Sequence, residues 1–137
     1  MIIVDTGPLI ALFDPQDHYH KKSKQILSRI HESLTTTEPV LTEAFYMLNG
    51  PSIGTKRLID FIVRGGMTVT HLTNERLIRA FELIDTYQKV EMELADASVI
   101  VAAEVHKTLK IFTFDNRDFH QYKVRKGHRH YAIEMMS

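Results

Sequence analysis

The sequence predicts an α/β domain in which helices cover a parallel sheet. Short runs of only apolar residues, such as residues 2–4, alternate with segments whose apolar residues recur every three or four positions. A wholly apolar run is typical of a strand buried on both faces, as in a parallel sheet. The chain has 137 residues, 44% hydrophobic and 25% charged, which is enough to bury one core. We therefore expect one domain spanning residues 1–137, without a linker or internal repeat.

The first four expected elements are a strand, two helical segments and a second strand. Residues 2–4 form the first strand, a Gly-Pro pair ends it, and residues 9–13 follow as a short helix or turn. Residues 18–31 place apolar side chains at helical spacing and predict a helix. Residues 35–37 are threonines, whose β-branched side chains favour a short strand.

The middle of the chain predicts two helices, a strand and a third helix. The first helix has Pro39 in its first turn, where the missing backbone N–H does no harm. Ser52 is a suitable N-cap for the second, which a Gly-Gly pair ends. Side chains alternate over residues 67–72, which predicts a strand, and Thr73 or Asn74 caps the third helix.

The last elements complete the alternation of strands with helices. Residues 94–107 predict a helix, and residues 111–114 form another short, β-rich run that ends at an aspartate. A final strand is expected over residues 131–133. This order of elements is typical of a parallel sheet layered with helices.

Composition excludes several classes of protein. The chain has no cysteine, which excludes a disulfide scaffold, a thiol nucleophile, a cysteine-based zinc site and an iron–sulfur cluster. Lys plus Arg and Asp plus Glu are both 17, so bulk positive charge does not hold nucleic acid, although a local basic patch remains available. No basic leader and no membrane-length apolar run are visible. We expect a cytoplasmic protein with no membrane partner.

Four carboxylates stand out because of their positions. Asp5 and Asp115 each directly follow an apolar strand, and ligands of open α/β sheets bind beyond the carboxyl ends of the strands. Glu43 and Asp96 interrupt apolar stretches near the start of expected helices, where a buried carboxylate needs a partner. The alternatives are that Asp5 and Asp115 only cap turns or helices, and that Glu43 and Asp96 lie on solvated helix faces.

The four carboxylates would repel one another if they met in one crevice. Each would raise the pKa of the others, and a hard cation such as Mg²⁺ or Mn²⁺ relieves that repulsion through oxygen ligands. Such an ion also activates water and offsets charge on a phosphodiester. The chemistry that fits is metal-dependent hydrolysis of a phosphate ester.

The segments around these acids resemble the four signature blocks of the PIN-domain nucleases. The segments are Val4-Asp5-Thr6-Gly7-Pro8-Leu9-Ile10-Ala11-Leu12, Leu41-Thr42-Glu43, Leu94-Ala95-Asp96-Ala97-Ser98 and Thr113-Phe114-Asp115-Asn116-Arg117-Asp118-Phe119. They come in the family's order and spacing, and the resemblance spans nearly the whole chain. Small single-domain members, including the VapC-like toxins of bacterial toxin–antitoxin pairs, match best in length.

The resemblance implies a fold, an activity and a site. The fold is a Rossmann-like, three-layer α/β/α domain with a central parallel sheet. The activity is that of a Mg²⁺- or Mn²⁺-dependent endoribonuclease, here the toxin of a type II toxin–antitoxin pair. The catalytic and metal-binding acids are Asp5, Glu43, Asp96 and Asp115. The residues placed beside these acids are Thr6, Thr113, Asn116 and Asp118; in the family the last is often a structural partner of the following phenylalanine.

Charge is zoned along the chain despite the zero total. Residues 119–133 carry four basic residues and no acid, and Tyr122, Tyr131 and His120 in this segment offer rings that stack on unpaired bases. The expected RNA-binding residues are Lys123, Arg125, Lys126 and Arg129. Residues 18–31 carry the same excess of positive charge, for which a solvated surface is an equal alternative.

Two adjacent helices carry apolar side chains that could face the core or a partner. The residues are Tyr46, Met47, Leu48, Leu58, Ile59 and Ile62. Core packing is the first expectation, and a surplus of exposed apolar surface would mark a dimer face or an antitoxin groove. We expect a homodimer, with RNA as substrate and a small antitoxin protein as partner.

Other functions remain as alternatives. The chain could be a non-catalytic PIN-like module that binds RNA or protein, or a housekeeping RNA-processing nuclease. An aspartyl-phosphate phosphatase normally needs a second acid two residues after the first, and Asp5-Thr6-Gly7 has none. The closely spaced histidine pairs His18/His20 and His128/His130 lack the spacing of a zinc site.

Overall fold

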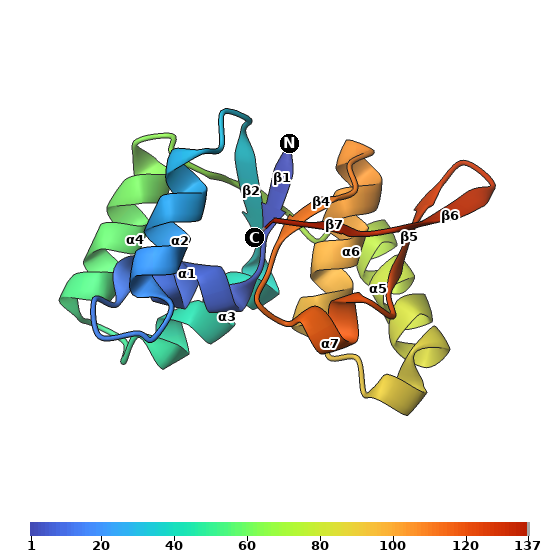
Figure 1. The fold of residues 1–137 in the computed structure, drawn as a ribbon. Helices are drawn as coiled ribbons and strands as arrows, with labels where there is room; N and C mark the ends of the chain where they lie inside the picture. The colour runs from blue at the N-terminus through green and yellow to red at the C-terminus, as the bar shows by residue number, and fades with distance from the viewer. Residues whose placement is uncertain (137) are drawn as a thin grey trace.

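A computed structural model describes residues 1–136 and contains a five-stranded parallel sheet with helices on both faces (Figure 1). The strands lie in the order β3-β2-β1-β4-β7, and each neighbouring pair is parallel. Their bounds are β1 (Ile2–Val4), β2 (Leu34–Thr37), β3 (Thr68–Thr70), β4 (Lys110–Phe112) and β7 (Glu134–Met135). The expected α/β class with a central parallel sheet is confirmed.

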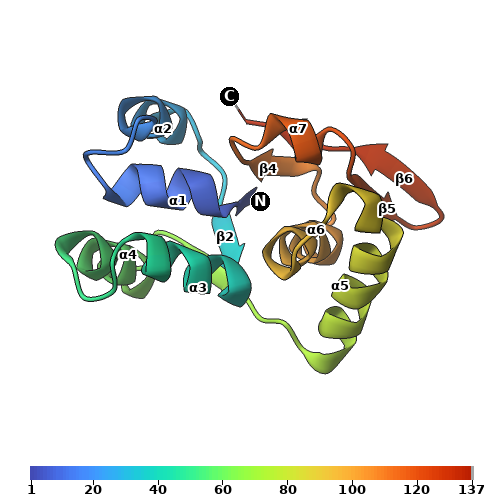
Figure 2. The same cartoon turned by 90° about the horizontal axis from the view of Figure 1, so that it is seen from below.

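Seven α-helices and one 3₁₀ turn are described within residues 1–136. They are α1 (Thr6–Phe13), α2 (His20–Ser28), α3 (Glu38–Met47), α4 (Ile53–Val63), α5 (Asn74–Thr86), the 3₁₀ turn Gln88–Val90, α6 (Leu94–His106) and α7 (Asn116–Phe119). Viewed from below, α1, α2 and α4 lie on one side of the sheet and α5 and α6 on the other (Figure 2). This arrangement is the expected three-layer fold. In the part of the chain that is described, no helix combines the length and apolar character that crossing a membrane requires.

The helix signals in the sequence act as expected. Pro39 lies in the first turn of α3, and the Ser52 side chain accepts a hydrogen bond from the backbone N–H of Thr55 at the start of α4. Thr73 caps α5 in the same way through the N–H of Arg76. These caps satisfy N–H groups that the first turn of a helix leaves without partners.

The central strand β1 is buried on both faces, as its apolar sequence predicts. Ile2, Ile3 and Val4 are each no more than 1% exposed. The strand pairs with β2 on one side and with β4 on the other, and Val4 lies opposite Phe112 in the β4 register. The carboxyl ends of β1 and β4 therefore meet at the same edge of the sheet.

The three threonines of β2 are also buried, and each hydroxyl has a hydrogen-bond partner. Thr36 Oγ1 donates to the carbonyl oxygen of Val4 at 2.8 Å. The hydroxyls of Thr35 and Thr37 pair with those of Thr70 and Ser98. Since an unpartnered buried hydroxyl costs free energy, these contacts explain how a polar strand occupies the core.

The strand order places a topological switch point between β1 and β4. The chain adds β2 and β3 on one side of β1 and returns to add β4 on the other. In open α/β sheets the crevice at this point is the usual ligand site. Helix α6 precedes β4 and runs back across the sheet, so its first turn lies at the same edge (Figure 1).

The C-terminal segment differs from the sequence prediction. Instead of one strand over residues 131–133, an antiparallel hairpin of β5 (Lys123–Lys126) and β6 (Arg129–Ala132) projects from the side of the molecule, and β7 then joins the sheet (Figure 1). The helix α7 also went unpredicted. These differences have one reason, which is the shortness of the elements. Helix α7 and strands β5 and β6 have four residues each and β7 has two, too few to show a hydrophobic period.

Candidate active site

Asp5 lies at the switch point and is almost completely buried, with 7% of its surface exposed. Its backbone N–H donates to the carbonyl oxygen of Phe112 at 2.9 Å, which continues the pairing of β1 with β4. The Asp5 side chain makes no capping hydrogen bond to α1. Its Oδ2 instead accepts a hydrogen bond from Thr113 Oγ1 at 2.8 Å. Asp5 therefore occupies the N-cap position of α1 without capping the helix through a side-chain hydrogen bond.

The environment of Asp5 is unfavourable to its negative charge. Burial raises the pKa of Asp5 from 3.8 to about 6, and the negative charges of Asp115 and Glu43 add to the rise. The hydrogen bond from Thr113 opposes the rise without cancelling it. The carboxylates that the sequence separates by up to 110 residues thus act on one another in the fold.

Glu43 is directed toward this group by Thr6. The Thr6 hydroxyl donates to Glu43 Oε1 at 2.9 Å, which joins the start of α1 to the middle of α3. Glu43 is half-buried, which shows that it does not lie on a fully solvated helix face. Thr6 and Thr113 therefore have the same role, since each donates a hydrogen bond from its hydroxyl to one of the four acids.

Asp96 lies in the first turn of α6 and is half-buried. Burial raises its pKa from 3.8 to about 7, and the charges of Asp5 and Asp115 contribute to the rise. The hydroxyl of Tyr122 donates to Asp96 Oδ2 at 3.2 Å. The expectation that Tyr122 stacks on RNA bases is wrong, because its side chain is fully buried against Phe119 and Tyr87.

Asp115 follows β4 and is exposed. It caps α7, because its Oδ1 accepts a hydrogen bond from the backbone N–H of Asp118 at 3.1 Å. The cap alternative therefore holds for Asp115, together with its electrostatic effect on Asp5 and Asp96. The pKa of Asp118 is raised, mainly by burial and then by the charge of Asp115. Asn116 is exposed at the start of α7.

Among the described residues, the charge of the four acids is not neutralised by a positive side chain. Within residues 1–136, none of them forms an ion pair with a lysine, arginine or histidine. Their donor atoms are all carboxylate oxygens, which suit a hard cation such as Mg²⁺ or Mn²⁺. Among the same residues, no group of three acidic or histidine side chains lies close enough, in the conformation described, to coordinate one metal ion. Mg²⁺ usually keeps several water ligands and binds one or two carboxylates directly, so a site for it does not require three side chains already within coordinating distance of one point.

The basic segment lies on the β5–β6 hairpin. Lys123, Arg125, Lys126 and Arg129 are all exposed. Glu104 Oε2 accepts the backbone N–H of Arg125 and also pairs with Arg79, which fixes the hairpin to α5 and α6. Figure 1 shows the hairpin projecting from the side of the domain. Contact with RNA at these residues stays a prediction.

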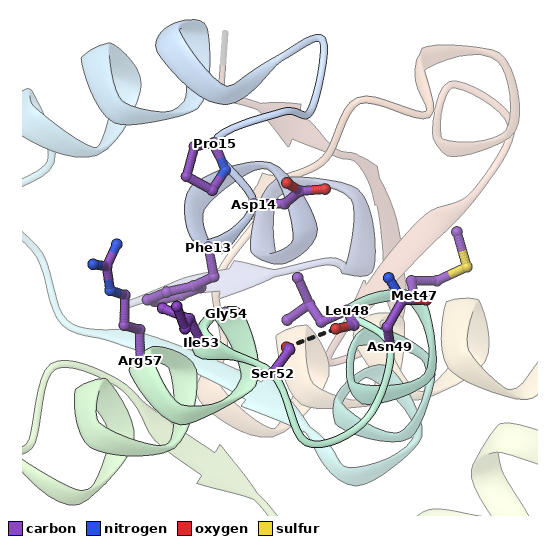
Figure 3. A pocket seen from close by; sticks show the side chains of 10 residues that line it. All are labelled: Phe13, Asp14, Pro15, Met47, Leu48, Asn49, Ser52, Ile53, Gly54 and Arg57. Atoms are coloured by element: carbon purple, nitrogen blue, oxygen red, sulfur yellow. Dashed lines mark hydrogen bonds between the residues drawn. The ribbon is translucent and has the colours of Figure 1, made fainter.

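Two surface pockets are relevant to function: one borders the acidic site and the other lies beside helices α3 and α4. A depression of about 450 Å³ borders Glu43 and is lined by the starts of α3 and α6. A second pocket, of about 420 Å³, lies between the end of α1 and the α3–α4 turn (Figure 3). Its lining residues are Phe13, Asp14, Pro15, Met47, Leu48, Asn49, Ser52, Ile53, Gly54 and Arg57.

The apolar residues of α3 and α4 divide between core and surface. Leu48 and Leu58 are buried, as core packing predicts. Tyr46, Met47 and Ile59 are 81%, 55% and 45% exposed. Exposed apolar surface of this kind is typical of an interaction face.

Comparisons with known proteins agree with this fold. A family model described as "PIN domain" matches residues 2–125. The chain is 23% identical over 135 residues to Ribonuclease VapC26 of Mycobacterium tuberculosis (strain ATCC 25618 / H37Rv), and the match covers 96% of this chain and 99% of that protein.

Two solved structures are similar in fold. The crystal structure of Mycobacterium tuberculosis VapC20, described as a sarcin–ricin loop cleaving toxin, has a TM-score of 0.78 and 21% identity, covering 85% of this chain and 92% of that one. A toxin–antitoxin complex from Klebsiella pneumoniae gives a TM-score of 0.68 and 18% identity, covering 87% and 90%.

Proposed function

Because the chain belongs to the PIN domain family, we propose that it is a metal-dependent endoribonuclease and the toxin of a toxin–antitoxin pair. The relative matched over nearly its whole length is named a ribonuclease, and one of the structural neighbours is a toxin–antitoxin complex. The observation that carries the proposal is the group of four carboxylates at the switch point without a cationic partner among the described residues.

The four acids would hold the metal ion. Bound there, Mg²⁺ or Mn²⁺ supplies charge neutralisation for a phosphodiester and activates a water molecule. Hydrolysis forms a bond between the water oxygen and phosphorus, breaks one backbone P–O bond and leaves the proton on the departing oxygen. The chain's own hydroxyls orient the acids: Thr113 fixes Asp5, Thr6 fixes Glu43 and Tyr122 fixes Asp96.

The basic hairpin supports the choice of RNA as substrate. Its four exposed cations lie on one projecting element, where they can contact backbone phosphates of a bound RNA. Tyr131 is 38% exposed on β6, and its ring lies 5.9 Å from Lys126 Nζ, so an aromatic surface accompanies the charge.

The exposed apolar face of α3 and α4 supports an antitoxin partner. We define this face by Tyr46, Met47 and Ile53, which are between 55% and 81% exposed. The pocket of about 420 Å³ borders it and supplies a concave seat for an apolar side chain of the antitoxin. Co-expression with the product of the neighbouring gene tests this partner, and replacement of Tyr46 by Lys is expected to weaken the complex.

The decisive experiment is RNA cleavage by the purified chain with and without divalent ions. The chain is expected to cleave RNA in the presence of Mg²⁺ or Mn²⁺ and to lose this activity in EDTA. Zn²⁺ alone is not expected to restore cleavage, and the Asp96→Asn variant is expected to be inactive. Asp85→Asn, an exposed acid on α5, is the matched control and is expected to cleave normally. Undiminished cleavage in EDTA contradicts the mechanism, and RNA binding without any cleavage favours a non-catalytic module.

A further inference from the structure

A stacked pair of aromatic rings lies outside the four acids. Tyr19 and Phe114 stack with ring centroids 4.6 Å apart and planes inclined by 24°. The ammonium of Lys22 lies 5.9 Å from the centre of the Tyr19 ring and 5.7 Å from that of Phe114. The group joins the end of the α1–α2 loop to the chain that leaves β4.

This aromatic pair borders the candidate active site. Phe114 stands between Thr113, which donates to Asp5, and Asp115. Its ring also lies against Gly7 at the start of α1, where an added Cβ would be 3.6 Å from the ring. The pair is therefore a direct continuation of the sheet edge that carries the acids.

Core packing does not account for Tyr19. Phe114 is half-buried and is supported by the edge of Phe112, with ring centroids 5.7 Å apart. Tyr19 lies over that support, has the His18 ring beside it at a centroid distance of 4.9 Å, and still stays 43% exposed. An aromatic ring that is held in place from behind and open to solvent loses little entropy when a base packs on it.

Positive charge lies beside the pair on α2. Lys21, Lys22 and Lys24 on α2 are exposed, and none of them forms an ion pair within residues 1–136. Aromatic rings next to unpaired cations match the two chemical parts of an unpaired nucleotide, a flat base and a phosphate.

We propose that Tyr19, supported by Phe114, stacks on an unpaired base next to the scissile phosphate, while Lys22 contacts the adjoining backbone phosphate. This inference rests on the proposed ribonuclease function and assigns a base-stacking residue and a phosphate contact beside its site. Stacking tolerates any base, so the contact selects strand state rather than sequence.

The test measures RNA binding by fluorescence anisotropy in the Asp96→Asn background, which leaves the RNA uncut. The probes are a labelled random-sequence single-stranded RNA pool and a duplex RNA of equal length. Tyr19→Ala is expected to weaken single-strand binding roughly 5- to 150-fold, the range for loss of one stacked base. Tyr19→Trp and Tyr19→Phe are expected to retain binding, and Phe81→Ala, which removes an exposed aromatic ring on α5, serves as the matched control.

Lys22 gives a second, independent measurement. Lys22→Ala is expected to lower the salt slope of single-strand binding by about one, and Lys56→Ala on α4 is expected to leave it unchanged. Unchanged binding in Tyr19→Ala, equal losses in Tyr19→Ala and Tyr19→Phe, or equal losses for duplex and single strand would each overturn the inference. If the wild-type chain neither binds nor cuts RNA, the proposed function itself fails. If the wild-type chain cleaves RNA normally and Tyr19→Ala binds single-stranded RNA as well as the wild type, only the proposed stacking site is contradicted.

Discussion

Asp5→Asn is expected to stabilise the metal-free protein at neutral and alkaline pH. The folded state raises the pKa of Asp5 from 3.8 to about 6, chiefly by burial and then through the neighbouring carboxylates. Asparagine keeps the shape, still accepts the hydrogen bond of Thr113, and carries no charge to bury. The substitution therefore removes a charge penalty rather than a packing contact.

The size of the effect follows from proton linkage. Between pH 3.8 and about 6 the folded state holds a proton that the unfolded chain has released, so stability falls as pH rises through this window. Above the window the full penalty applies, and a rise from 3.8 to about 6 corresponds to about 3 kcal/mol. Asp5→Asn avoids it, so its gain is at most about 3 kcal/mol near pH 8, or about 10 °C in Tm. Near pH 4 the two proteins converge.

The assay is urea unfolding in EDTA at several pH values between about 4 and 8, with the midpoint and the m-value both fitted. Asp85→Asn on the exposed face of α5 is the control, and its effect should stay below about 1 kcal/mol. Adding Mn²⁺ should stabilise the wild type and leave Asp5→Asn nearly unaffected. A variant less stable than the wild type near pH 8, or a difference that does not change with pH, would refute the reasoning.

Three further predictions concern the supports of the site and the assembly. Tyr122→Phe removes the hydroxyl that orients Asp96 and is expected to weaken Mn²⁺ binding, measured by titration calorimetry, roughly 10- to 100-fold. Tyr87→Phe, from the same aromatic cluster, is the control and is expected to leave Mn²⁺ binding unchanged. Equal losses of Mn²⁺ affinity in the two variants would show a packing effect only. Arg125→Ala with Lys126→Ala is expected to flatten the salt dependence of RNA binding by about one unit per lost phosphate contact, with little change in single-turnover rate at saturating RNA. An unchanged slope would make these residues ordinary surface. Light scattering is expected to give a mass twice the 15.8 kDa of the chain, and a monomer would contradict the expected homodimer.

The sequence alone predicted the layers of the fold and the position of Asp5 at the edge of the sheet. A run of only apolar residues at 2–4 has no polar side to expose, which favours a strand inside a covered sheet, and the structure has these residues buried in β1. An acid directly after such a strand lies at the sheet edge wherever the strand is placed. Asp5 could thus be located before its partners were known.

Only the tertiary structure decided how the acids are held and what surrounds them. The contacts of Thr113 with Asp5, Thr6 with Glu43 and Tyr122 with Asp96 join residues 108, 37 and 26 positions apart, and no local pattern encodes such pairs. The same holds for the β5–β6 hairpin. Its position depends on Glu104, which accepts the N–H of Arg125 from a different element. Tyr19 and Phe114 likewise stack only because α2 and the end of β4 are brought together by the packing of other segments. Long-range contacts of this kind depend on the whole chain folding, which explains why periodicity predicted the elements and not the site's supports.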